Sequence, residues 1–184
     1  ILAGPAYRQT LGLTWNPGAT CSAAIGQSDN AFTPIQLAAY AMTIANNGVR
    51  YKTHLVQSVI SYDGVETPVE PEVVATAELS QTAIDTVRQG MRQVMTDGTA
   101  MWAFRDASYT AAGKTGTAEA GNGGSDHGTF IAYAPYDDPE VAIAVVLENG
   151  TSRPSTAVAK AMLDAYFESK DAGTAPTPEG ELLP

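Results

Sequence analysis

The stretch that decides the fold is AAGKTGTAEA, residues 111–120. Its letters Gly113-Lys114-Thr115 also end a phosphate-binding P-loop, so two structures compete for it. A P-loop needs a glycine with four residues between it and the Gly-Lys pair, because backbone N–H groups of that loop wrap the phosphates. That position holds Ser108. The residues after Thr117 are rich in glycine, where a P-loop would enter a helix, and we therefore predict a β-strand over residues 111–118.

A strand here places chemically useful groups in alternation. Lys114 and Gly116 share one face, while Thr115 and Thr117 share the other. Strand twist at a sheet edge can still bring the lysine ammonium and both hydroxyls to one cleft, and Gly116 lets a substrate backbone approach closely. The N–H of Thr117 can point at a developing oxyanion. An ordinary solvent-facing lysine produces the same triplet, so the surrounding sequence must decide.

The elements predicted around this strand describe an α+β domain, with helices packed on an antiparallel sheet. Strands are predicted over residues 111–118, 129–134 and 141–148, and their short connections favour an antiparallel meander. One further helical turn is predicted at residues 101–104. Caps, prolines and stop signals delimit three longer helices, from Thr33-Pro34 to Asn47-Gly48, from Ser80 to Asp97-Gly98, and onward from Pro154.

Other segments carry weaker signals. Residues 1–30 are rich in Gly, Pro and Thr and predict a loop with a short helical piece. Residues 51–62 predict one strand that ends in a turn at Asp63-Gly64. Residues 1–170 are expected to form the folded part, and residues 171–184 a tail that is disordered by composition. The last helix is predicted to turn four apolar side chains toward the core: Val158, Met162, Ala165 and Tyr166.

Composition excludes several classes of function. The 184 residues, 44% of them hydrophobic, suffice for one domain. The net charge of -10 argues against binding to nucleic acid or to an anionic membrane surface. The single cysteine, Cys21, cannot form a disulfide within the chain, and neither it nor the two histidines form a metal motif, so no metal and no cofactor is expected. The longest apolar run, Val141 to Leu147, is too short to span a membrane.

Five segments, in order, resemble class B penicillin-binding proteins, the peptidoglycan D,D-transpeptidases. The resemblance runs from about residue 11 to residue 169, and it implies part of the penicillin-binding, serine β-lactamase-like transpeptidase fold. A common aromatic before Phe130 is replaced by Gly128-Thr129. The matching segments are IGQSDNAFTPIQLA with IANNG (residues 25–48), GM…V…GTA (residues 90–100), AGKTGTAE (residues 112–119), HGTFIAYAP (residues 127–135) and VAIAVVLE (residues 141–148).

The resemblance implies a mechanism and a site. A serine upstream would attack the D-Ala-D-Ala amide of a peptidoglycan stem peptide, a second stem's amine would resolve the acyl-enzyme, and β-lactam antibiotics would stall that step. Lys114 would supply positive charge, and the Thr115 and Thr117 hydroxyls would hold the substrate carboxylate beside Gly116. The Thr117 N–H would form half of the oxyanion hole. No cofactor is implied, and the parent protein would act at the extracytoplasmic face of the bacterial cytoplasmic membrane.

Part of the implied machinery is missing from this chain. None of its serines has a lysine three residues later, so the Ser-x-x-Lys nucleophile motif is absent. The chain opens Ile1-Leu2-Ala3-Gly4 without a signal peptide, and we expect the C-terminal portion of a transpeptidase domain that pairs with the upstream part of the same domain. Ser28-Asp29-Asn30 spells a second motif of these enzymes, yet it lies inside the helix lead-in, and we interpret it as structural.

Some residues are left without a chemical role, and some alternatives stay open. Gln27, Thr33 and Arg153 are expected to be structural. His127 is expected to be a loop residue, with a substrate-side role near the cleft as the alternative. A non-catalytic β-lactam sensor or scaffold and a related serine β-lactamase or D,D-carboxypeptidase are the alternatives to a transpeptidase. The sequence upstream of Ile1 would separate the three.

Overall fold

The computed structural model describes residues 1–119 and 124–172. Residues 120–123, within the predicted glycine-rich connector, and residues 173–184 of the predicted tail lie outside the described residues. The helices are α1 (Pro5–Thr10), α2 (Pro17–Ala24), α3 (Pro34–Ala45), α4 (Gln81–Thr96), α5 (Met101–Phe104) and α6 (Ser152–Asp171). The strands are β1 (Val49–Tyr51), β2 (Ser58–Ile60), β3 (Glu66–Pro68), β4 (Val73–Thr76), β5 (Ala112–Ala118), β6 (His127–Ala134) and β7 (Val141–Leu147).

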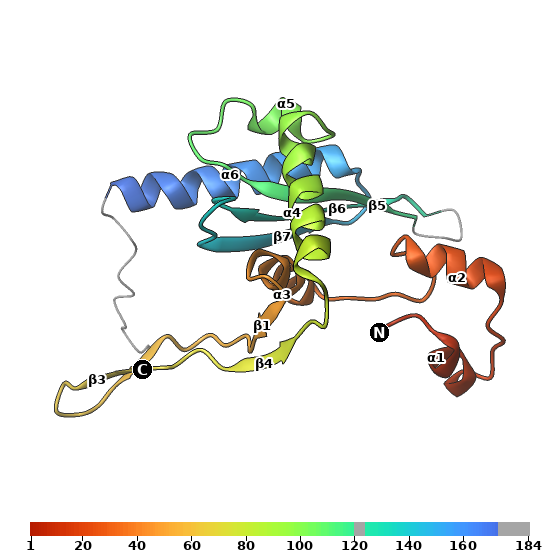
Figure 1. Ribbon diagram of the computed structural model, residues 1–184, viewed down its shortest axis with the longest axis horizontal. Coiled ribbons are helices and arrows are strands. Elements are labelled where there is room, and N and C mark those ends of the chain that lie inside the picture. The colour runs from red at the N-terminus through yellow and green to blue at the C-terminus, as the bar shows by residue number, and fades with distance from the viewer. Residues whose placement is uncertain (120–123, 173–184) are drawn as a thin grey trace.

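A three-stranded antiparallel meander forms the centre of the molecule, as predicted. Its order is β5-β6-β7, with Lys114 opposite Ile131 and Ile131 opposite Ala144. The two outer strands each expose one edge within the described part of the chain. Figure 1 shows α3, α4 and α6 gathered around this sheet, while the β2–β3 hairpin and the α1–α2 segment extend away on opposite sides.

Helices cover both faces of the sheet, and each face has its own apolar cluster. On one face, Phe130 and Ala132 of β6 pack with Leu163 of α6 and Phe104 of α5, and the first three are fully buried. On the other face, Tyr133 packs with residues of α3 and α4, including Ala45 and Met91. Burial on both faces explains why β6 and β7 are apolar almost throughout.

The predicted helix caps are confirmed. The Thr33 hydroxyl accepts the N–H of Gln36, and the Gln36 side chain accepts the N–H of Thr33, which forms a capping box at the start of α3. Asn47 and Gly48 follow the helix with positive φ angles of 53° and 89°. Ser80 caps α4 by accepting the N–H of Ala83.

Two predictions for the first half of the chain are wrong. Residues 1–30 contain two helices, because Pro5 and Pro17 occupy first helical positions and the Asn16 side chain caps α2 by accepting the N–H of Ala19. Residues 51–62 are not one strand. β1 pairs with β4 and β2 pairs with β3, so the chain leaves one ladder before it enters the other, and local alternation does not reveal the change of partner.

The predicted inner face of α6 is also wrong. Val158, Met162 and Tyr166 are 41%, 49% and 37% exposed, and Ala165 is exposed as well. The buried face is smaller and more polar: Ser155, Thr156, Ala159 and Leu163. Small side chains let the helix approach the sheet closely, and the Ser155 and Thr156 hydroxyls donate to the Ser152 carbonyl, so they enter the core with their hydrogen bonds made. A large apolar stripe therefore stays on the surface.

No helix within residues 1–119 and 124–172 is long and apolar enough to cross a lipid bilayer.

Candidate functional site

Strand β5 carries the predicted site, and its faces are as the sequence predicts. Lys114 and Gly116 lie opposite Ile131 and Thr129, on the α3 side of the sheet, where Ala112 and Tyr133 are also buried. Thr115 and Thr117 lie on the α6 side, opposite Phe130 and Gly128. Lys114 and Thr117 are exposed, and Thr115 is half-buried. Lys114 lies inside β5, which continues to Ala118, whereas a P-loop lysine would stand at the start of a helix, so this is not a P-loop.

The free edge of β5 gathers the polar groups of the site. The Lys114 ammonium donates to the Thr115 carbonyl (Nζ–O 2.6 Å), and the Gln27 amide donates to the Thr117 carbonyl (Nε2–O 3.4 Å). The carbonyls of residues 115 and 117 therefore point away from β6. Because the N–H and C=O of one strand residue point to the same side, the N–H of Thr117 faces this free edge too. The geometry places the lysine ammonium and this N–H along one edge.

The hydroxyl of Thr115 has a partner on the α6 side of the sheet. Its Oγ1 lies 2.9 Å from the Oγ1 of Thr99, which follows α4. Thr99 belongs to the GTA segment, residues 98–100, for which the sequence predicts no role. The contact places the α4–α5 turn directly against β5.

Gly116 packs closely against the Thr129 side chain of the neighbouring strand. A Cβ at this position would come within 2.2 Å of Thr129 Oγ1 on β6, a distance that real side chains do not adopt. The prediction that Gly116 binds substrate through close backbone approach stays a prediction, because the neighbouring strand alone already explains the glycine.

Two arginines of α4 hold one end of the β5–β6 pair, where β5 begins and β6 ends. Arg92 donates to the Ala111 carbonyl, directly before β5 (Nη1–O 2.9 Å). Arg88 donates to the Asn47 side chain at 2.8 Å and to the Tyr136 carbonyl at 3.0 Å, after β6. Burial raises the pKa of the Tyr133 hydroxyl, against the opposing effect of Arg88, whose Nε lies 3.4 Å from that oxygen. These contacts make a rigid base for β5.

The Ser28-Asp29-Asn30 segment is structural, as interpreted from the sequence. Ser28 has a positive φ of 65°, and Asp29 forms an ion pair with Arg8. The Asn30 side chain donates to the carbonyls of Ala23 and Gln27 and accepts the N–H of Ala3. The Asp and Asn side chains are therefore used in holding the loop.

Strand β6 begins two residues earlier than predicted. His127 is its first residue rather than a loop residue, and its Nδ1 accepts the N–H of Asn149 at 3.2 Å. Gly128 is buried, and a Cβ there would lie 1.9 Å from the Thr151 carbonyl at the start of α6. Gly128 thus makes room for the backbone of α6.

Thr33 and Arg153 make structural contacts, as the sequence predicts. Thr33 caps α3, and the Arg153 guanidinium lies over the Trp102 ring, 4.1 Å from its centroid. Within the described ranges, no group of three or more His, Cys, Asp or Glu side chains is arranged to hold a metal ion. The sequence predicted no role for Thr99 or Arg92, and it did not predict that Gln27 contacts β5. Each of these three residues contacts β5 or the residue before it from a segment distant in sequence.

A family model described as the penicillin binding protein transpeptidase domain matches residues 7–168. The match includes β5, the GTA segment and the loop that carries Gln27. It covers nearly all of the described structure.

Curated relatives agree with this match. The chain is 38% identical over 168 residues to penicillin-binding protein 2A of Bacillus subtilis, an alignment that covers 80% of the chain and 23% of the relative. It is 32% identical over 176 residues to the peptidoglycan D,D-transpeptidase MrdA of Haemophilus influenzae, covering 85% of the chain and 27% of the relative. The chain spans about a quarter of the length of these relatives.

Solved structures confirm the predicted fold class. Penicillin-binding protein 2 of Pseudomonas aeruginosa, in complex with WCK 5153, superposes with a TM-score of 0.75 at 32% identity, covering 90% of this chain and 38% of that one. The imipenem acyl-enzyme of penicillin-binding protein A from Mycobacterium tuberculosis superposes with a TM-score of 0.72 at 29% identity. That match covers 87% of this chain and 38% of the other chain.

Proposed function

We propose that this chain, which belongs to the family of penicillin binding protein transpeptidase domains, supplies the substrate-binding strand of a peptidoglycan D,D-transpeptidase. The observation that carries the proposal is the free edge of β5, where the Lys114 ammonium and the Thr117 N–H, three residues apart in sequence, lie along one edge. The whole protein would cross-link stem peptides and would bind β-lactams as mimics of the donor.

An extended peptide fits this edge. An edge strand presents unpaired N–H and C=O groups, and a peptide can add to it as a further strand. The outward N–H and C=O groups of Thr115 and Thr117 would hold the backbone of a stem peptide. The Thr117 hydroxyl is exposed and would bind the terminal carboxylate, while that of Thr115 is shared with Thr99.

The charge and the donor at this edge suit acyl transfer. The Thr117 N–H would donate to the oxyanion that forms when a serine attacks the scissile carbonyl, since donors fixed before the reaction cost no reorganisation during it. Lys114 would leave the Thr115 carbonyl and turn toward the nucleophile, raising the positive potential there. The serine and its base would come from a part of the protein outside this sequence.

The upstream part of the same domain would be the first partner. A groove of about 850 Å³ runs beside α3, β1 and the first residues, and its lining includes Phe32, Ile35, Tyr40 and Tyr51. The apolar stripe of α6 and the outer edge of β7 are exposed as well. Apolar surface of this extent marks a contact with protein. The parent would act at the extracytoplasmic face of the bacterial membrane.

A labelling experiment on the intact protein tests this function. Fluorescent penicillin should acylate the wild type, and Lys114→Ala should slow acylation by at least about 100-fold, the scale seen when one preorganised transition-state group is removed. Lys170→Ala is the matched control, because Lys170 is an exposed lysine at the end of α6, paired with Glu140. Undiminished labelling of Lys114→Ala would overturn the role of β5.

A further inference from the structure

We propose that Gln27 is a positioning residue: its side-chain amide holds the C-terminal end of β5 and so sets the direction of the Thr117 N–H. This inference rests on the proposed function, in which that N–H stabilises the oxyanion. Gln27 touches backbone rather than substrate, and its effect would pass through the strand.

The contact joins two segments 90 residues apart. Gln27 Nε2 donates to the Thr117 carbonyl at 3.4 Å, and the side chain is half-buried. This carbonyl lies on the edge of β5 that has no strand neighbour in the described structure, so the sheet gives it no partner. The pairing with β6 ends one residue later, where Ala118 lies opposite His127. Gln27 therefore braces the strand at the point where the ladder stops.

The loop that carries Gln27 is itself held from several sides. Asn30 donates to the Gln27 carbonyl at 3.1 Å and to the Ala23 carbonyl at 3.3 Å, and its oxygen accepts the N–H of Ala3 at 2.9 Å. Asp29 is bound by Arg8 through two guanidinium nitrogens. Ser28, which lies between Gln27 and Asp29, adopts a left-handed backbone conformation and turns the chain there. Because the loop is held by these contacts, the Gln27 side chain can fix the position of the Thr117 carbonyl to which it donates.

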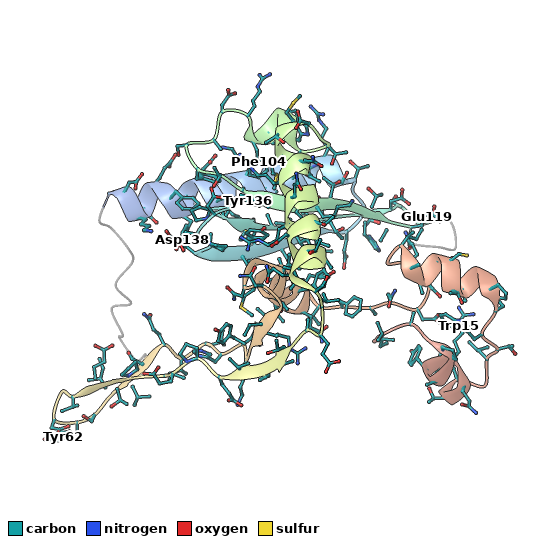
Figure 2. All side chains as sticks on the ribbon, viewed as in Figure 1. Trp15, Tyr62, Phe104, Glu119, Tyr136 and Asp138 are labelled. Carbon is teal, nitrogen blue, oxygen red and sulfur yellow. The ribbon has the colours of Figure 1, made fainter. Side chains whose placement is uncertain are left out.

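Figure 2 shows Glu119, the residue just after β5, on the side of the molecule where α2 lies. The Gln27 contact joins the loop that follows α2 to this end of the strand. The motif-like letters Ser28-Asp29-Asn30 then serve the reaction indirectly. They hold Gln27, and Gln27 holds the peptide group that follows the oxyanion donor. A misplacement of about 1 Å at such a donor can slow a reaction roughly 100-fold.

The first measurement uses this chain. The carbonyl ¹³C shift of Thr117 reports the hydrogen bond that this oxygen accepts, so it should move in Gln27→Met, which keeps the length of the side chain and removes the donor. Gln57→Met, in the segment before β2, should leave it unchanged. Identical Thr117 shifts in Gln27→Met and wild type would refute the contact in solution.

The second measurement uses the intact protein and fluorescent penicillin. Gln27→Met should lower the limiting rate of acylation about tenfold, a fraction of the loss seen when a donor is removed outright. The half-saturating concentration should stay near that of the wild type, because the change acts on the transition state rather than on binding. Gln27→Lys retains a donor and should recover most of the rate, which a purely structural defect would not do.

The two proposals fail in different ways. If Lys114→Ala labels as fast as the wild type, the proposed function is wrong whatever Gln27 does. If Lys114→Ala is inert while Gln27→Met acylates at the wild-type rate, the function stands and the positioning role of Gln27 is refuted. Equal rates for Gln27→Lys and Gln27→Met would also refute it.

Discussion

The hydroxyl oxygens of Thr99 and Thr115 lie 2.9 Å apart, and one donates a hydrogen bond to the other. Thr99 stands in the turn after α4, and Thr115 stands in the middle of β5. The bond ties the turn to the strand on the face opposite Lys114. Thr115 is thus the member of the triplet whose side chain supports the strand.

Removing this bond should destabilise the chain modestly. Thr99→Val and Thr115→Val should each lower the free energy of unfolding by about 1 kcal/mol, because each leaves a hydroxyl without its partner. Urea unfolding followed by circular dichroism measures the change, with Thr67→Val on the exposed β3 strand as the control. The double variant should cost less than the sum of the single ones, and strict additivity would show that the two hydroxyls do not interact.

Gly116→Ala should destabilise the sheet, and Thr129→Ala should rescue it. The added Cβ would lie 2.2 Å from Thr129 Oγ1 but 3.6 Å from Thr129 Cβ, so removing the hydroxyl leaves an ordinary contact. Gly116→Ala alone should cost roughly 1–3 kcal/mol, the range for an overpacked site. Thermal unfolding of the single and double variants measures this. A double variant as unstable as Gly116→Ala would mean that the clash is not with this hydroxyl.

Gly128→Ala should be far more damaging, with no side-chain rescue. Its Cβ would lie 1.9 Å from the backbone carbonyl of Thr151. A backbone carbonyl cannot relieve such a contact by changing rotamer, as a side chain can. We expect a loss of soluble folded protein, or a fall in unfolding free energy above about 4 kcal/mol. Gly90→Ala is the matched control, since nothing lies within 4 Å of its Cβ and it sits inside α4. That change should stabilise the chain by up to about 1 kcal/mol.

Acid should loosen the loop that carries Gln27. The hydrogen bond from Arg8 lowers the pKa of the Asp29 carboxyl below its ordinary value of 3.8, against a smaller opposing effect of desolvation. The ion pair therefore stabilises the fold above that value, and its contribution is lost as the pH falls through the lowered pKa. The Ala3 N–H, which donates to Asn30, reports the loop by hydrogen exchange.

The pH comparison needs two variants. Between pH 6 and pH 3, protection of the Ala3 N–H should fall in the wild type and in Asp138→Asn, whose side chain lies exposed in the β6–β7 turn. It should be low and flat in Asp29→Asn, which has no carboxylate to titrate. The same pH dependence in Asp29→Asn as in the wild type would assign the effect to another group.

Local signals predicted most of the fold, because they depend on neighbouring residues. The cap at Thr33, the stop at Asn47-Gly48 and the cap at Ser80 each act within one helical turn, and all three are confirmed. The meander of β5, β6 and β7 follows from short connections between apolar strands. The failures come where a partner distant in sequence decides, as in residues 51–62, which divide between two ladders.

The buried face of α6 shows the same limit in another form. Hydrophobicity alone favours Val158, Met162 and Tyr166 as the inner face, but the sheet accepts the smaller Ser155, Thr156 and Ala159 instead. The choice depends on how closely two backbones approach, and a sequence does not record that distance. The larger stripe then stays available for contact with another part of the protein.

The sequence by itself determined the strand, its alternation of faces and the family, since these depend on residue types and on their order along the chain. Only the tertiary structure decided which groups meet at the edge of β5. Thr99 reaches Thr115, Arg92 reaches Ala111, and Gln27 crosses 90 residues to reach Thr117. Each of these contacts exists because packing brings distant segments within hydrogen-bonding distance, and no local pattern of letters encodes that approach.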